Sequence, residues 1–177
     1  MRSKLTINFL TLFCFLFLLS VVSCSSCNKD QSDNQRLRQN ALKSATKMSD
    51  AYLEADFKTF IDLTLPLLVE SVGGKERMME HLVFGSDEFA KQNISILELN
   101  VLEVHKIVRS SAFEHQALIS QEMVMRTSQG WVRDTQLLAG FSGFMGSTWQ
   151  FIQIQEYDYD RMSRIVPYIS PDLFEKK

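Results

Sequence analysis

Cysteine is scarce in this chain and is confined to its beginning. The 177 residues contain three cysteines, Cys14, Cys24 and Cys27, and none follows Cys27. A disulfide between Cys24 and Cys27 would close a very short loop, so it would stabilise the fold little. Because no cysteine follows Cys27, the folded part has neither a disulfide framework nor a cysteine metal site, and we expect its hydrophobic core to stabilise it.

The chain also lacks the motifs that mark common metal and phosphate sites. His81, His105 and His115 have acidic neighbours, but adjacent strand residues point to opposite faces and no HExxH pair occurs. The glycine-rich run 140–146 has no lysine before its hydroxyl residues, unlike a phosphate loop. We predict no metal and no cofactor, and we interpret 140–146 as a hairpin connection. Its Phe141, Phe144 and Met145 would be exposed or folded over a pocket mouth, with a ligand gate as an alternative role.

An excess of positive charge is absent as well. The formal net charge is −2, and it becomes more negative if Arg2 and Lys4 are removed with a signal. This balance gives no electrostatic reason to bind nucleic acid or an anionic membrane surface. The length fits one domain with a sizeable core.

The beginning of the chain has the layout of a secretory signal. Arg2 and Lys4 precede an almost entirely apolar stretch, residues 5–22, and small residues follow it. A lasting transmembrane helix usually needs about 20 apolar residues, so this stretch is borderline for permanent spanning. An uncleaved anchor or an ordinary signal is the alternative to a lipoprotein signal.

The residues before Cys24 resemble the bacterial lipobox. In Val21-Val22-Ser23-Cys24 an aliphatic residue and a small residue precede the cysteine. The resemblance implies that diacylglycerol is attached to the Cys24 sulfur, that residues 1–23 are removed, and that the new amino terminus is acylated, as with palmitate. Several acyl chains make a stable anchor. Cys27 is the alternative attachment site, although its −3 position is Cys24 rather than an aliphatic residue.

These features predict a lipid-anchored protein of the bacterial cell envelope, on the periplasmic or surface-facing leaflet of the outer membrane. Lys29-Asp30 resembles the charged tag that sends some bacterial lipoproteins to the surface. The small, polar residues after Cys24 predict a flexible tether, so that 24–34 is the lipidated cysteine with its tether and 35–177 is a single domain.

Helical periodicity opens this domain. Ser32 and Gln35 stand at capping-box spacing, which predicts a helix start there. The apolar residues of this helix recur every three or four positions, at Leu37, Ala41, Ala45, Met48, Tyr52 and Ala55. Asp56 is a predicted cap for a short helix over 57–64.

Proline and glycine predict where the next helices begin and end. Pro66 suits the first turn of a helix over 66–72, and Gly73-Gly74 stops it. A further helix is predicted over 75–83, and residues 85–92 add one more turn.

After Asn93 the periodicity becomes alternating. It predicts four strands, over 94–107, 111–127, 131–142 and 147–156. In the first strand the apolar pattern changes phase after Ile96 and again after Val101, which is what β-bulges produce. Short links make the first three strands antiparallel neighbours. Helices followed by antiparallel strands predict an α+β fold with the helices on one face.

The second strand has an apolar and a polar face in this pattern. The apolar set is Phe113, Ala117, Ile119, Met123 and Met125, and the polar set is Glu114, Gln116, Ser120, Glu122 and Arg126.

The chain is similar to the nuclear-transport-factor-2-like superfamily over roughly residues 35–157. The similarity lies in AYLEADFKTFIDLTLPLLVESVGGKERMMEHL, the long strands after it, and STWQFIQI near the end. It implies a cone, in which a strongly curved, mostly antiparallel sheet of four or more strands wraps the helices around a deep pocket. It also implies that the tail 157–177 packs back on the domain, and that a homodimer can form through the sheet.

The enzymes of this superfamily, which include polyketide-cyclase-like and ketosteroid-isomerase-like members, use a buried Asp or His with a Tyr partner. By strand parity His115 lies on the Ala117 face, and Tyr52 lies on the apolar stripe of the first helix, so these two are the candidate catalytic residues. No aspartate has an interior strand position, since Asp134 shares parity with the polar Gln136. Core packing is the alternative role for both candidates.

The predicted pocket lining is Tyr52, His115, Trp149 and Phe151, with core packing again the alternative. Because no catalytic set is assembled, we expect a non-catalytic module that binds a small apolar ligand or an envelope protein partner. The alternatives are an isomerase- or hydrolase-like enzyme using His115 and Tyr52, and a structural subunit that dimerises.

Overall fold

The computed structural model describes residues 25–110, 113–154 and 159–174, and the chain divides into two compact units, Met1–Arg36 and Leu37–Lys177. The predicted signal, 1–23, and Cys24 lie outside the described residues. None of the described helices combines the length and the apolar character needed to cross a membrane.

Helix α2 spans Ser25–Leu53. The described part of the first unit is its first turns, with an exposed ion pair between Arg36 and Asp33 (3.6 Å). The predicted helix start at Ser32 is wrong, and residues 25–34 are helical where a flexible tether was expected. No glycine or proline occurs in 25–53, so no helix-breaking residue prevents the helix from beginning before Ser32.

The predicted starts of the two short helices are confirmed in the second unit. A side-chain oxygen of Asp56 accepts a hydrogen bond from the backbone N–H of Thr59 (3.1 Å) and caps α3, Phe57–Leu63. Pro66 occupies the first turn of α4, Pro66–Ser71.

Helix α5 spans Lys75–Lys91 and is longer than predicted. It follows Gly73 and Gly74, whose φ angles of 101° and 97° end α4 as the sequence indicated. The predicted end near residue 83 is wrong, because Gly85 continues the helix. A Cβ at Gly85 would meet no atom within 4 Å, so this glycine lies in open space on the helix surface and serves no packing purpose.

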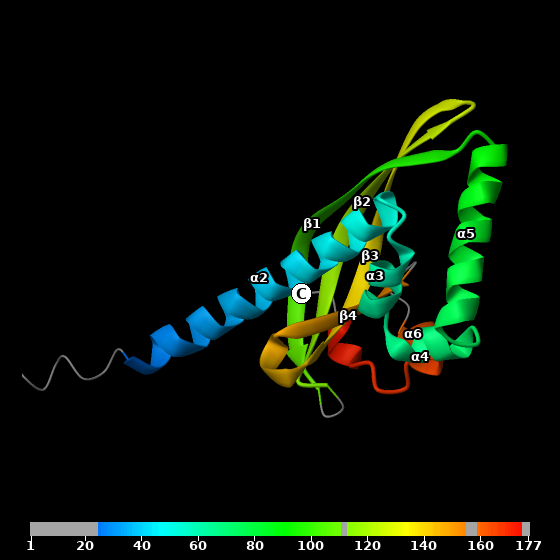
Figure 1. The fold of residues 1–177 in the computed structure, drawn as a ribbon. Helices are drawn as coiled ribbons and strands as arrows, with labels where there is room; N and C mark the ends of the chain where they lie inside the picture. Colours follow the sequence, from blue (N-terminus) through cyan, green and yellow to red (C-terminus); the bar gives the residue numbers. More distant parts are fainter. Residues whose placement is uncertain (1–24, 111–112, 155–158, 175–177) are drawn as a thin grey trace, which may run out of the picture. The chain divides into compact units, whose positions relative to one another are not determined.

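Four strands form one antiparallel sheet in the order β1-β2-β3-β4 (Figure 1). They are β1 Ser95–Arg109, β2 His115–Thr127, β3 Gly130–Gly143 and β4 Thr148–Ile154. The α+β class and the four antiparallel strands are confirmed, and within the described residues the sheet is not closed between β1 and β4. The chain continues through a 3-10 turn at Phe144–Gly146, helix α6 at Tyr159–Ile165, and a second 3-10 turn at Pro171–Leu173.

Strand β1 is irregular where its apolar pattern changes phase. Its register against β2 shifts between Ile96 and Glu98 and between Val101 and Glu103, as predicted, and a third shift follows Val104. Each extra residue bends the strand and increases its twist.

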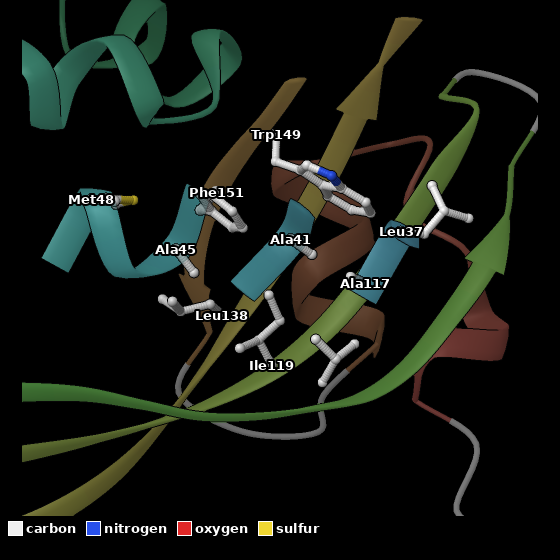
Figure 2. Close-up of a cluster of buried hydrophobic side chains, with 10 residues drawn as sticks. Leu37, Ala41, Ala45, Met48, Ala117, Ile119, Leu138, Trp149 and Phe151 are labelled. Atoms are coloured by element: carbon white, nitrogen blue, oxygen red, sulfur yellow. The ribbon is translucent and has the colours of Figure 1, made fainter. Parts of the chain in front are cut away.

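A core cluster lies between α2 and one face of the sheet (Figure 2). We call it the helix-side cluster. Its buried residues are Leu37, Ala41, Ala45, Met48, Val104, Ala117, Ile119, Leu138, Trp149 and Phe151. Ala41 and Ala45, four residues apart on α2, have small side chains, so the helix approaches the sheet closely there.

A second core cluster lies on the opposite face, and the C-terminal segment covers it. We call it the tail-side cluster. Its buried residues are Leu65, Leu118, Ala139, Phe141, Ile152, Ile154, Met162, Val166, Ile169 and Leu173. The expectation that the tail packs back on the domain is therefore confirmed for its described part, residues 159–174.

Two predictions fail because the sheet is covered on both faces. Gln116 and Ser120, assigned to the polar face of β2, are buried, and β2 is buried on both sides from Gln116 to Gln121. Phe141, expected at a pocket mouth, is 1% exposed in the tail-side cluster. The alternating pattern predicted that only one face of the sheet is covered, whereas the C-terminal segment covers the other face as well.

Candidate functional site

A cavity of about 410 Å³ lies between α5 and the helix-side face of the sheet. Its apolar lining includes Met78, Leu82 and Phe89 of α5 together with Ile96, Leu99 and Met123 of the strands. The hydrogen-bonding side chains that line it are Ser49, Tyr52, Thr64, Gln121, Gln136 and Gln153. None of the lining residues that the structure describes is charged.

The sheet wall of the cavity follows from strand register. Gln121 stands opposite Gln136, Leu99 opposite Met123, and Leu138 opposite Gln153, so these side chains share one face across four strands. A parallel bridge between Thr64 and Phe151 joins the end of α3 to β4 at the edge of this wall.

Helix α5 forms the opposite wall and is loosely packed. None of its side chains is buried, although Met78 and Leu82 are half-buried toward the cavity. On its other side Phe84 is 64% exposed and Val83 is 45% exposed. An ion pair between Lys75 and Asp62 of α3 holds the start of the helix, and Figure 1 shows α5 standing beside the sheet.

A buried hydrogen-bond chain connects α2 with β2 at the cavity. The Nε2 of Gln121 donates to the Oγ of Ser49 (2.6 Å), and that hydroxyl donates to the carbonyl oxygen of Ala45 (3.0 Å). Gln136 makes only a long contact from its Nε2 to the sulfur of Met123 (3.6 Å), which is a weak acceptor. Within the described part of the chain, the side-chain oxygens of Gln121 and Gln136 accept no hydrogen bond.

Tyr52, one of the candidate site residues, lines the cavity. It packs against the rings of Phe57 and Phe60, with centroids 6.0 and 5.4 Å apart. Burial raises the pKa of the Tyr52 phenol, which keeps the hydroxyl protonated. Phe151 also lines the cavity from β4.

His115 does not line the cavity. Its Nδ1 lies 4.0 Å from the position that a Cβ of Gly146 would occupy, and Leu37 lies against the same position. Leu37 and Tyr52 are 15 residues apart on one α-helix, which at 1.5 Å per residue separates them by roughly 22 Å. The predicted catalytic pair of His115 and Tyr52 is therefore not brought together.

The imidazole of His115 has the environment of a packing residue. Its Nδ1 is buried and has no hydrogen-bond partner among the described residues. Burial lowers the pKa of His115, the positive charge of Arg109 lowers it further, and Glu114 opposes them. The side chain is thus held neutral at pH 7.

Trp149 and the glycine-rich run also lie away from the cavity. Trp149 is 2% exposed in the helix-side cluster (Figure 2), and its Nε1 donates to the carbonyl oxygen of Gly146 (3.0 Å). Asn40 donates to the same oxygen (3.1 Å). Residues 140–143 belong to β3, and no described side chain of 140–146 lines the cavity, so the expected ligand gate is not found there.

The sequence patterns were not taken to indicate Gln121 or the cavity-facing side of α5, and Gln136 was wrongly assigned to the polar face of its strand. A signal for Gln121 was present, because it interrupts the apolar face between Ile119 and Met123. Gln136 likewise shares the parity of Leu138. A polar residue on a core-facing position of a strand indicates either a buried hydrogen bond or a ligand contact.

Among the described residues, no group of three or more His, Cys, Asp and Glu side chains could hold a metal ion. Cys27 lies in the first turn of α2, and Cys24 lies outside the described residues. No protein-family model and no curated protein matches the chain.

Proposed function

We propose that the chain is a bacterial lipoprotein whose domain binds a small apolar molecule, without catalysis, in the cavity beneath α5. The observation that carries this proposal is the size and lining of the cavity. A volume of about 410 Å³ falls within the range of roughly 300–1,000 Å³ usual for ligand sites, and apolar side chains with a few polar groups are their usual lining.

The anchoring part of the proposal rests on the amino-terminal sequence. The basic start, the apolar stretch 5–22 and the lipobox-like residues before Cys24 support lipid attachment at the envelope. We further propose that the domain is a nuclear-transport-factor-2-like cone. The order of helices before strands, the bulged β1 and a cavity between helices and sheet all support this likeness.

The separation of His115 from Tyr52 removes the support for the enzyme alternative that used this pair. Binding of an envelope protein, or dimerisation through the sheet, stays as the alternative proposal if the cavity holds no ligand.

Processing of the chain tests the anchor. In its own bacterium, Cys24→Ala should abolish globomycin-sensitive processing, whereas Cys27→Ala should leave it intact. Loss of processing only in Cys27→Ala would identify Cys27 as the site of lipid attachment. Normal processing in both variants would overturn the lipoprotein proposal.

Filling the cavity tests the ligand. Leu82→Trp adds volume on the cavity side of α5, and Val83→Trp adds the same side chain at the neighbouring exposed position. Small molecules extracted from the wild-type chain and both variants, each purified from the native host, would be quantified by mass spectrometry. We expect a molecule shared by wild type and Val83→Trp and depleted at least about tenfold in Leu82→Trp. Equal depletion in both variants, or no such molecule, would contradict the proposal.

A further inference from the structure

We infer that the ligand of this cavity is an uncharged apolar alcohol whose hydroxyl group is bound between the side-chain amides of Gln121 and Gln136. This inference rests on the proposed function, because it names the chemical class of the molecule that the cavity would hold.

The described lining of the cavity offers no charge that would pair with an ionic group on the ligand. No Asp, Glu, Lys, Arg or His is among the described residues that line the cavity. A carboxylate or ammonium group that leaves water without a partner of opposite charge costs far more free energy than a neutral polar group does. A fatty acid anion or an alkylamine would therefore have to leave its head group at the surface.

The hydrogen bonds of Gln121 determine which group of its side-chain amide is left to bind a ligand. The hydroxyl of Ser49 has a single proton, which it donates to the carbonyl oxygen of Ala45, so toward Gln121 it can only accept. The NH₂ group of Gln121 must therefore face Ser49. Gln121 is 6% exposed and lines the cavity. Its Oε1 accepts no hydrogen bond from any described residue, so this oxygen can accept one from a ligand.

Gln136 offers the complementary group beside it. It stands directly opposite Gln121 across β2 and β3, on the same face of the sheet. Its NH₂ group faces the sulfur of Met123 at 3.6 Å. Because a thioether is a weak acceptor, an oxygen of a ligand would be a better partner for this donor.

An acceptor and a donor side by side match a hydroxyl group, which donates one hydrogen bond and accepts others. A ketone or an ether could only accept, and it would leave the oxygen of Gln121 unpaired. Leaving a buried acceptor unpaired weakens binding, so these groups should bind less tightly than the alcohol.

A set of photoreactive probes with one chain and four head groups tests the inference. Diazirine derivatives of 1-dodecanol, its methyl ether, dodecanoate and dodecylammonium would be added to the full chain in lipid nanodiscs. Labelling of cavity peptides from α5 and β2 would be quantified by mass spectrometry. We expect the alcohol to half-saturate this labelling at a concentration about tenfold lower than either ion and about fivefold lower than the ether.

A glutamine variant separates head-group recognition from the general attraction of the probe to membranes. Gln136→Leu should reduce the preference for the alcohol over the ether toward unity. Gln129→Leu, at an exposed position in the β2–β3 turn, should leave the preference unchanged.

The outcomes distinguish the two proposals. If the ether or dodecanoate labels the cavity as well as the alcohol does, the inference is overturned and the proposed apolar binding stands. If no probe labels the cavity above a peptide remote from it, the proposed function fails, and the inference fails with it. An unchanged alcohol preference in Gln136→Leu would remove Gln136 from the site.

Discussion

The side-chain Oε1 of Gln116 on β2 accepts a hydrogen bond from the backbone N–H of Ser170 in the C-terminal segment, at 2.8 Å. The Nε2 of the same amide donates to the carbonyl oxygen of Tyr168, also at 2.8 Å. One fully buried side chain thus satisfies two backbone groups of the segment that covers the tail-side cluster.

Replacing this amide should loosen the C-terminal segment. Gln116→Leu keeps the volume but leaves both backbone groups without their partner, so we expect the free energy of unfolding to fall by about 1–3 kcal/mol. Urea unfolding monitored by circular dichroism would measure the change, with Gln129→Leu at an exposed turn as the control. Equal losses in the two variants would show that the amide does not hold the segment.

Gly146 is a position that should not accept a side chain. Its φ of 71° is unfavourable for other residues, and a Cβ there would lie 2.0 Å from Cδ2 of Leu37. We expect Gly146→Ala to lower the free energy of unfolding by more than about 1 kcal/mol. The control is Gly130→Ala, where φ is 121° but a Cβ would meet no atom within 4 Å.

The double variant Gly146→Ala with Leu37→Ala separates the two causes at this position. It should lose less stability than the sum of the single variants, because the second change removes the clash. Simple additivity would show that the backbone angle alone determines the cost.

Asp56 should make the fold sensitive to acid. The hydrogen bond from Thr59 lowers the pKa of the Asp56 carboxyl, with smaller contributions from Lys58 and Lys47. Its stabilising effect is therefore present above the ordinary pKa near 3.8 and is lost as the pH falls through the lower pKa of the folded state.

Asn in place of Asp56 keeps a capping acceptor but cannot titrate. The difference in unfolding free energy between wild type and Asp56→Asn should thus be larger at pH 6 than at pH 3. Unfolding in urea at the two pH values would measure it, and a difference that does not change with pH would contradict the assignment.

His115 should destabilise the fold as the pH falls through neutrality. Because its pKa is lowered in the folded state, the unfolded chain takes up the proton first, below the ordinary pKa of about 6.5. His115→Phe removes the titration together with the buried Nδ1, which has no hydrogen-bond partner among the described residues. We expect thermal unfolding of this variant to depend less on pH between 7.5 and 5.5 than that of the wild type. An unchanged dependence would contradict this assignment.

Local signals in the sequence predicted the starts of two helices and two irregularities of β1. Asp56 and Pro66 marked the starts of α3 and α4, because capping and proline geometry depend on only a few neighbouring residues. The phase changes near Ile96 and Val101 located two bulges of β1, since each extra residue moves the apolar pattern to the other face. The third shift, after Val104, lies near the predicted end of the strand, where little pattern remained to reveal it.

Features that depend on distant segments were not predictable in this way. Gln116 was assigned to a polar face because strand parity cannot show that the tail covers it. The lining of the cavity was not predicted because it depends on where α5 lies against the sheet, which local sequence patterns do not determine. His115 was placed near Tyr52 because strand parity gives a face but not a position along α2.

We propose that the cavity beneath α5 holds a small apolar molecule. Native mass spectrometry of the full-length protein, released from membranes of its own host, tests it most directly. We expect a protein mass increased by one small-molecule adduct, which is lost on collisional activation and absent in Leu82→Trp. A mass that corresponds to the protein with no such adduct, as monomer or dimer, would contradict the proposed binding and favour a role in protein association.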